Sequence, residues 1–118
     1  MTRICPAIAA VLSVISIVAM PAIHAEKVHT VTVHAKKYAF VPAEITLHKG
    51  ETVKLKLISD DVDHGLAVKA LDIRADMPKG KPVEVVVTPE QAGDFAGTCS
   101  HFCGMGHGSM NFVVHVVD

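Results

Sequence analysis

The sequence predicts an all-β fold, a sandwich or barrel of antiparallel strands. Short segments rich in Val, Ile, Leu and Thr recur along the chain and are separated by Gly, Pro or Asp, which is the pattern of such folds. The clearest segment, residues 52–58, alternates apolar and charged side chains, as expected of a strand with one buried and one wet face. Helix signals are nearly absent.

The N-terminal segment has the features of a secretory signal peptide. Arg3 precedes an apolar stretch over about residues 4–18, and small residues follow up to Ala25, an arrangement typical of a cleaved signal. The stretch is shorter than the roughly 20 apolar residues of a membrane span. We therefore expect residues 1–25 to be removed and residues 26–118 to form one domain, periplasmic or otherwise exported, with no stable membrane span. An uncleaved anchor is the alternative.

The predicted strands follow one another through the rest of the chain. Residues 59–63 form an acidic loop and residues 71–81 a long connection of mixed polarity. The strands are expected at residues 28–34, 45–48, 52–58, 64–68, 82–88, 92–98 and 111–117. A segment rich in Cys, His and Met therefore connects the last two strands.

The composition excludes one class of function. Twelve acidic and 11 basic residues give a formal net charge of −1, which lacks the basic footprint of a nucleic-acid binder. Two cysteines, Cys99 and Cys103, remain after signal removal. In an oxidising compartment such a pair is by default a disulfide, but the residues around it favour a metal site.

The segment between the last two predicted strands carries a set of soft metal ligands. Cys103, His107 and Met110, with His64 from a distant strand start, would make a mononuclear blue-copper site of one thiolate, two imidazoles and a weak thioether. Cys99 adds a second thiol that can approach the first, so that both sulfurs bridge two metal ions. Two thiolates, a terminal imidazole on each ion, a weak thioether on one and a weak carbonyl oxygen on the other then form a complete dinuclear set.

The loop resembles CuA, the purple dinuclear copper centre of cytochrome c oxidase subunit II and nitrous oxide reductase. The family pattern is Cys-x-x-x-Cys-x-x-x-His-x-x-Met with an upstream His, and every position is matched. The resemblance implies that Cys99 and Cys103 bridge two copper ions, that His64 and His107 are terminal ligands, that Met110 is the weak thioether, and that His101 supplies its backbone carbonyl.

The resemblance also implies a fold and a role. It implies a cupredoxin-like Greek-key β-sandwich or barrel that binds two copper ions and relays single electrons without being an enzyme itself. Its partners would be redox proteins such as a c-type cytochrome or a terminal oxidase or reductase.

Three alternatives to electron transfer by copper stay open. A periplasmic copper metallochaperone would use His101 and Met105 beside the loop to loosen the site. Zinc would accept four N and S ligands, although Met is a poor ligand for it. A thiol–disulfide reductant would act through Cys99 and Cys103, but the Cys-x-x-Cys spacing and βαβ pattern of such proteins are missing.

Other polar residues have simpler interpretations. Met77 could approach the copper site or pack in the core, and packing is the expected role. The acidic residues Asp60, Asp61 and Asp63 are expected either to form a solvated loop or to make a negative rim that steers a positively charged partner. The remaining histidines after the signal are expected at solvated strand positions: His29, His34, His48 and His115.

Overall fold

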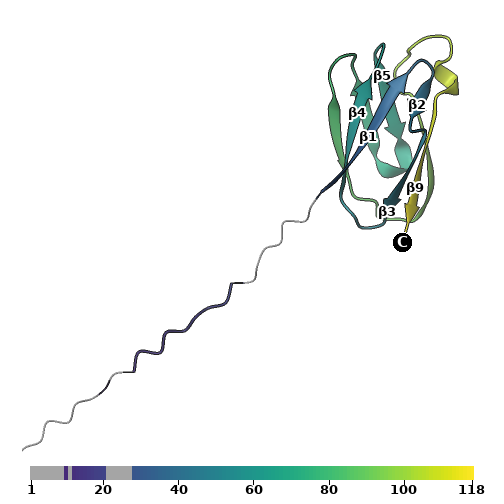
Figure 1. Ribbon diagram of the computed structural model, residues 1–118. Helices are drawn as coiled ribbons and strands as arrows, with labels where there is room; N and C mark the ends of the chain where they lie inside the picture. Colours follow the sequence, from purple (N-terminus) through teal and green to yellow (C-terminus); the bar gives the residue numbers. More distant parts are fainter. Residues whose placement is uncertain (1–9, 11, 21–27) are drawn as a thin grey trace, which may run out of the picture.

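The computed structural model describes residues 10, 12–20 and 28–118. Two β-sheets face each other and form a sandwich (Figure 1). Sheet A has the strand order β2-β1-β4-β7 and consists of β2 (Ala39–Val41), β1 (His29–Lys36), β4 (Val53–Ser59) and β7 (Val83–Val87). Sheet B has the strand order β3-β9-β8-β5-β6 and consists of β3 (Glu44–His48), β9 (Asn111–Val117), β8 (Gly93–Thr98), β5 (His64–Val68) and β6 (Ile73–Met77).

The predicted all-β sandwich is confirmed, but two of its strand pairs are parallel rather than antiparallel. β1 pairs in parallel with β4, with His29 opposite Val53, and β3 pairs in parallel with β9. Between β1 and β4 the chain passes through β2 in sheet A and then β3 in sheet B. This crossing returns the chain to the end where β1 begins, so β4 runs in the same direction as β1.

The core fills the space between the sheets. In β4, Val53, Leu55 and Leu57 are buried and alternate with partly exposed residues, as the sequence pattern predicted. Phe40 of β2 and Phe112 of β9 meet edge to face with ring centroids 5.6 Å apart. This aromatic contact joins the two sheets through their buried faces.

Two strands were missed in the sequence, the three-residue β2 and the longer β6. Residues 71–81 were expected to be a connection, but they contain β6, in which Ile73, Ala75 and Met77 are buried and alternate with exposed Arg74 and Asp76. Arg74 and Asp76 made this segment look polar in the sequence. Its side chains nevertheless alternate in the manner of a strand, with the apolar ones on the buried face. The packing of Met77 in the core is confirmed, because its side chain has no exposed surface.

Most connections between the strands are short. Between β3 and β4 the chain turns at Lys49 and Gly50, and Gly50 has a φ of +80°, which favours glycine. The single-turn 3₁₀ helices η1 (Lys69–Leu71) and η2 (His107–Ser109) are the helical elements of the described residues. As expected, the segment from Cys99 to Met110 joins β8 to β9.

The predicted signal peptide falls mostly outside the described residues, and its cleavage stays a prediction. Residues 12–20, which are described, contain no helix or strand, and their apolar side chains, such as Leu12 and Met20, are more than 80% exposed. Among the described residues there is no helix with the length and apolar character that crossing a membrane requires.

Candidate metal centre

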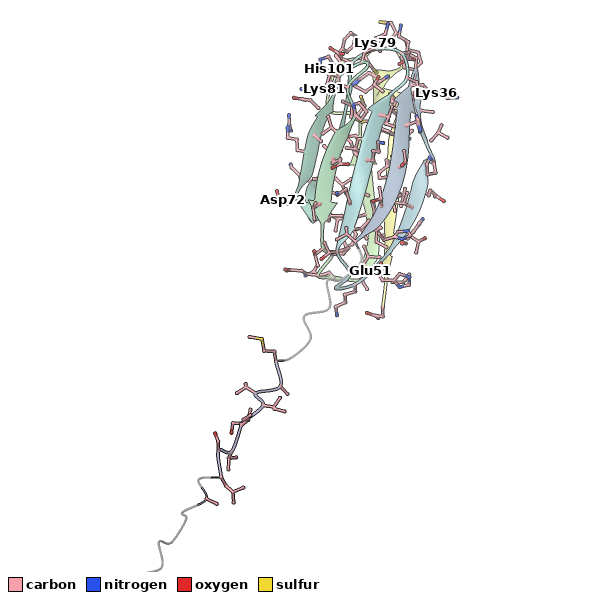
Figure 2. The ribbon with its side chains drawn as sticks, turned by 60° about the vertical axis from the view of Figure 1, so that its left-hand side comes forward. Lys36, Glu51, Asp72, Lys79, Lys81 and His101 are labelled. Carbon is pink, nitrogen blue, oxygen red and sulfur yellow. The ribbon has the colours of Figure 1, made fainter. Side chains whose placement is uncertain are left out.

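The candidate ligands gather at one end of the sandwich. His64 is the first residue of β5, and the other candidates lie in the connection between β8 and β9. Figure 2 shows His101 at this end together with Lys79 and Lys36, whereas Glu51 marks the opposite end. Sheet B therefore provides the anchoring strands for every candidate ligand.

The two cysteines lie side by side as free thiols. Their sulfur atoms are 3.9 Å apart, and Cys99 and Cys103 are 4% and 7% exposed. A disulfide would need a separation of about 2.05 Å. The observed separation is less than two metal–sulfur bonds of about 2.3 Å each, so a metal ion can contact both sulfurs at once.

An imidazole lies beside each sulfur. The Nδ1 atom of His64 is 3.9 Å from the sulfur of Cys99, and the Nδ1 atom of His107 is 3.9 Å from the sulfur of Cys103. One metal–nitrogen bond of about 2.0 Å and one metal–sulfur bond of about 2.3 Å span such a gap. The four donors therefore follow one another in the order His64, Cys99, Cys103, His107.

Two weaker donors complete the set. The sulfur of Met110, whose side chain is buried, is 3.4 Å from the sulfur of Cys103. The carbonyl oxygen of His101 is 3.1 Å from the sulfur of Cys99. The imidazole of His101 is exposed and its Nδ1 lies 3.0 Å from the carbonyl oxygen of Phe102, so the main chain rather than the side chain of His101 faces the cysteines.

The loop reaches this conformation because it lies close against β5. The N–H of Ser100 donates to the carbonyl oxygen of Gly65, 3.2 Å away. A Cβ atom on Gly65 would collide with the hydroxyl of Ser100 and lie 3.2 Å from the backbone nitrogen of His101. Because Gly65 has no side chain, the segment that carries Cys99 can lie close enough to β5 to place Cys99 beside His64.

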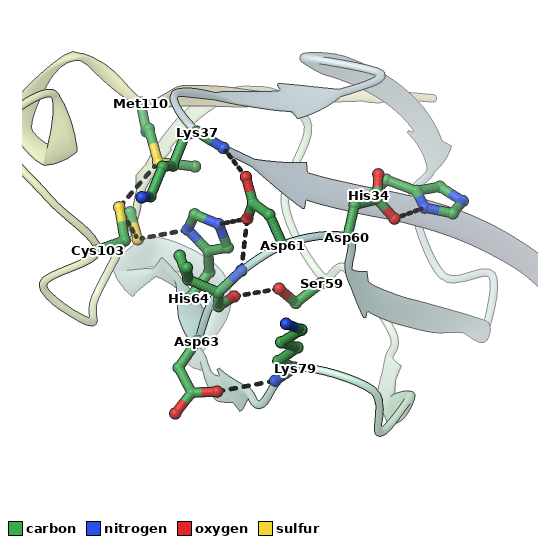
Figure 3. A network of polar contacts seen from close by, with 12 residues as sticks. His34, Lys37, Ser59, Asp60, Asp61, Asp63, His64, Lys79, Cys103 and Met110 are labelled. Atoms are coloured by element: carbon green, nitrogen blue, oxygen red, sulfur yellow. Dashed lines mark hydrogen bonds and ion pairs between the residues drawn. The ribbon is translucent and has the colours of Figure 1, made fainter.

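Asp61 fixes the orientation of His64, a role the sequence did not reveal. Its Oδ1 atom is 2.8 Å from Nε2 of His64, and its Oδ2 atom accepts a hydrogen bond of 2.7 Å from the backbone N–H of Lys37 (Figure 3). Because an ionised carboxylate only accepts hydrogen bonds, Nε2 carries the imidazole proton. In the neutral imidazole Nδ1 then carries no proton, and it faces Cys99, which is the arrangement that carboxylate–histidine–metal triads use.

The charge of Asp61 is stabilised by these contacts. Burial alone would raise its pKa, but the hydrogen bonds from the Lys37 backbone, His64 and the Val62 backbone outweigh burial and lower the pKa from 3.8 to about 2. The carboxylate is thus ionised at any pH near neutrality. A signal for this role in the sequence would have been an acid three residues before a candidate ligand, which is too common to be specific.

The other acidic residues of the loop are held by hydrogen bonds. Asp60 contacts His34 at 2.8 Å, and Asp63 accepts a hydrogen bond from the backbone N–H of Lys79 at 2.8 Å (Figure 3). The loop is therefore an ordered network around His64 rather than a simply solvated turn. The four other histidines lie on strands, at exposed or half-buried positions: His29, His34, His48 and His115.

The Cys103 thiol holds its proton more tightly in the metal-free protein than a solvent-exposed cysteine does. Burial, and then the neighbouring Cys99, raise the pKa of the Cys103 thiol above its usual 9.0. A metal ion that takes up thiolates at this site must therefore displace protons.

The donor set fits copper. Among the described residues, His64, Cys99 and Cys103 form a buried group whose ligand atoms all lie within 4.8 Å of one another. Thiolates and thioethers are soft ligands that select Cu(I), and imidazole also suits copper. The buried thioether of Met110, beside Cys103, is a poor ligand for zinc and a suitable one for copper.

Comparison with known proteins identifies the class. A family model described as a cupredoxin-like domain matches residues 7–112, a range that begins inside the predicted signal segment. The chain belongs to this cupredoxin-like family, and it is homologous to the CuA domain of cytochrome c oxidase subunit II. The predicted resemblance and the cupredoxin-like sandwich are therefore confirmed, and the homology implies copper binding.

Specific relatives show the extent of the similarity. A probable cytochrome c oxidase subunit 2 of Streptomyces avermitilis is 39% identical over 72 residues, which are 61% of this chain and 23% of the relative. Cytochrome c oxidase subunit 2 of Thermus thermophilus is 30% identical over 82 residues, 70% of this chain and 61% of the relative. The chain thus spans between about a quarter and three fifths of these relatives.

A solved structure shares the fold. The periplasmic domain of subunit II of the cytochrome oxidase of Bradyrhizobium japonicum superposes with a TM-score of 0.71 at 19% sequence identity. The match covers 76% of this chain and 84% of that domain.

Proposed function

We propose that this chain is an exported copper protein with a dinuclear CuA-type centre that relays single electrons to or from a respiratory redox partner. His64, Cys99, Cys103, His107 and Met110 hold the two copper ions, together with the carbonyl oxygen of His101. The partner is a c-type cytochrome or a terminal oxidase or reductase, and the chain itself is an electron carrier rather than an enzyme.

One observation carries the proposal. The two buried sulfurs lie 3.9 Å apart, with one imidazole Nδ1 beside each at the same distance. A mononuclear blue-copper site contains one thiolate and does not require a second thiol beside another imidazole. A centre with two bridging thiolates requires one terminal imidazole on each metal ion. The weak donors repeat this pairing, because Met110 lies beside Cys103 and the His101 carbonyl beside Cys99.

The chain's own residues create the conditions for electron transfer. When bound, a pair of copper ions sharing one electron supplies the redox chemistry. His64, Cys99 and Met110 are buried, which excludes water from the donors, and Asp61 holds the His64 ring in place. Ligands that are fixed before a metal binds change position little with redox state, which is what an electron carrier requires.

Copper loading tests the proposal. We expect the protein with reduced thiols to bind two copper ions per chain. After one-electron oxidation of the Cu(I)-loaded protein by an added chemical oxidant, it should give an electron paramagnetic resonance spectrum of one unpaired electron shared by both ions. Cys99→Ser should leave at most one copper with a localised spin, and His101→Ala should leave the shared spectrum in place because only the carbonyl of that residue faces the site. One copper with a localised spin in the wild-type protein would contradict the dinuclear centre.

A copper metallochaperone is the second candidate, and the surface of the loop favours it. Met105 is 96% exposed and the imidazole of His101 is exposed as well, so soft donors stand outside the buried centre where a copper acceptor can reach them. Such a protein should pass Cu(I) rapidly to a competing acceptor, and Met105→Leu should slow the transfer. An electron carrier should retain its copper through repeated oxidation and reduction.

Export is tested separately. Expression of the full sequence in a bacterium should yield a periplasmic protein that begins at Glu26, which N-terminal sequencing would show. A protein that keeps residues 1–25 and sediments with membranes would support the anchored alternative.

A further inference from the structure

The two-residue turn Lys37–Tyr38, between β1 and β2, reaches the metal centre from the opposite sheet. β1 and β2 belong to sheet A, whereas the candidate ligands are anchored in sheet B. Figure 3 shows the backbone nitrogen of Lys37 joined to the carboxylate of Asp61, whose other oxygen contacts the His64 ring. The turn therefore lies outside the ligand cluster but within hydrogen-bond distance of its support.

One side of the turn is connected to His64. The backbone N–H of Lys37 donates to Oδ2 of Asp61 at 2.7 Å, and Oδ1 of the same carboxylate is 2.8 Å from Nε2 of His64. This connection uses the main chain of Lys37, so the position of the turn, rather than the lysine side chain, determines where Asp61 lies.

The other side of the turn packs on the segment that carries His107. A Cβ atom on Gly106 would lie 2.5 Å from the ring of Tyr38, and one on Gly104 would lie 3.1 Å from Cε1 of the same ring. The two glycines flank Met105 between Cys103 and His107, and the N–H of His107 donates to the carbonyl oxygen of Gly104 at 3.1 Å. The Tyr38 ring therefore rests directly on the backbone that places His107.

We propose that the turn Lys37–Tyr38 is a clamp that holds both terminal imidazoles, His64 through Asp61 and His107 through the Gly104–Gly106 backbone. Tyr38 is a positioning residue: its ring packs on Gly104 and Gly106 and limits the movement of the loop. The proposal rests on the proposed function in that His64 and His107 bind metal. It explains why a tyrosine that is 40% exposed lies over two glycines rather than in the core.

Copper release measures the clamp. The copper-loaded full chain is mixed with an excess of bathocuproine disulfonate, a Cu(I) chelator, under reducing conditions. Tyr38→Ala should release copper about 10- to 100-fold faster than wild type, which matches the size of the loss in metal affinity when support behind a metal ligand is removed. Tyr38→Phe keeps the ring and should release copper at nearly the wild-type rate.

A matched control separates positioning from general destabilisation. Phe95 is a partly buried aromatic residue of β8 that lies near Leu71 and Pro89, away from the copper loop. Phe95→Ala should weaken the fold as Tyr38→Ala does but leave copper release unchanged. Equal release rates for Tyr38→Ala and Phe95→Ala would overturn the clamp.

A double-mutant cycle tests the contact itself. Gly106 has a φ of −90°, which alanine adopts without strain, so the effect of Gly106→Ala comes from its contact with the Tyr38 ring. Gly106→Ala should speed copper release in the wild-type background and add little in the Tyr38→Ala background. Additive effects of the two substitutions would contradict a direct contact between them.

A readout without copper distinguishes this proposal from the proposed function. Amide hydrogen exchange of residues 104–109 in the metal-free protein should be faster in Tyr38→Ala than in wild type, and unchanged in Phe95→Ala. If the wild-type protein binds one copper but exchange and release still depend on Tyr38, the dinuclear centre fails and the clamp stands. If two copper ions bind and neither quantity depends on Tyr38, the clamp fails and the dinuclear centre stands.

Discussion

Replacing Asp61 by asparagine should destabilise the metal-free protein and disorder His64. The substitution removes a charge that accepts hydrogen bonds from His64 and from the Lys37 and Val62 backbones. An asparagine offers one acceptor oxygen and one NH₂ group. At least one of the three N–H groups would then face the NH₂ group of the asparagine instead of an acceptor oxygen.

The magnitude follows from the pKa of the carboxyl group. A pKa lowered from 3.8 to about 2 corresponds to about 2.4 kcal/mol of stabilisation of the ionised form in the folded state. Because 35% of the Asp61 side chain is exposed, screening by solvent reduces the effect, and we expect a loss of about 1 to 2 kcal/mol near pH 7. Since the folded-state pKa is lowered, this stabilisation is present above pH 3.8 and is lost as the pH falls toward 2.

Urea unfolding of the metal-free protein is the assay. Asp60→Asn is the matched control, because it removes the same charge from the neighbouring position, where the side chain contacts exposed His34 instead of His64. The free energy of unfolding should fall for Asp61→Asn well below the value for Asp60→Asn at pH 7, and the gap should narrow toward pH 3. Equal stabilities of the two variants at pH 7 would refute the reasoning.

Three further substitutions test other contacts. Met110→Leu should keep two copper ions and shift the reduction potential, because a weak thioether ligand tunes the potential of a copper site; redox titration followed by electron paramagnetic resonance checks this, and an unchanged potential would contradict ligation by Met110. Phe112→Ala removes a side chain with no exposed surface and should cost about 3–5 kcal/mol in chemical unfolding. The hydrogen bond to Asp94, 2.6 Å away, raises the pKa of His115 above 6.5, so a nuclear magnetic resonance titration of its ring should have a midpoint above 6.5 that returns toward that value in Asp94→Asn. The stabilisation by this pair is present below pH 6.5 and is lost as the pH rises through the folded-state pKa.

The sequence predicted the elements whose side chains repeat with a strand period. The strand at residues 52–58 and the final strand at 111–117 appear as β4 and β9 within one residue of the predicted ends. The spacing of the cysteine loop, likewise, brings Cys99, Cys103 and His107 together as expected. In both cases the information lies in residues close together in the chain.

The sequence did not predict features that depend on distant residues. β6 was missed because Arg74 and Asp76 interrupt its apolar pattern, and only pairing with β5 shows that the alternation is real. The role of Asp61 was missed because the partner of one of its oxygens, Lys37, lies 24 residues away. The packing of Tyr38 on Gly106 joins residues that nothing in the linear sequence connects.

The two sheets contribute differently to the centre. Sheet B anchors the donors, which lie at distances that metal ions can span before any metal is bound. Sheet A, through the Lys37–Tyr38 turn, restrains the two imidazoles from outside. If the loop were flexible, metal binding would have to order it at a cost in conformational entropy. In this protein the loop is ordered on folding, before a metal binds. A loop held in this way has little freedom to move when the charge of the centre changes, and this restraint supports the proposed electron transfer rather than the alternative of metal delivery.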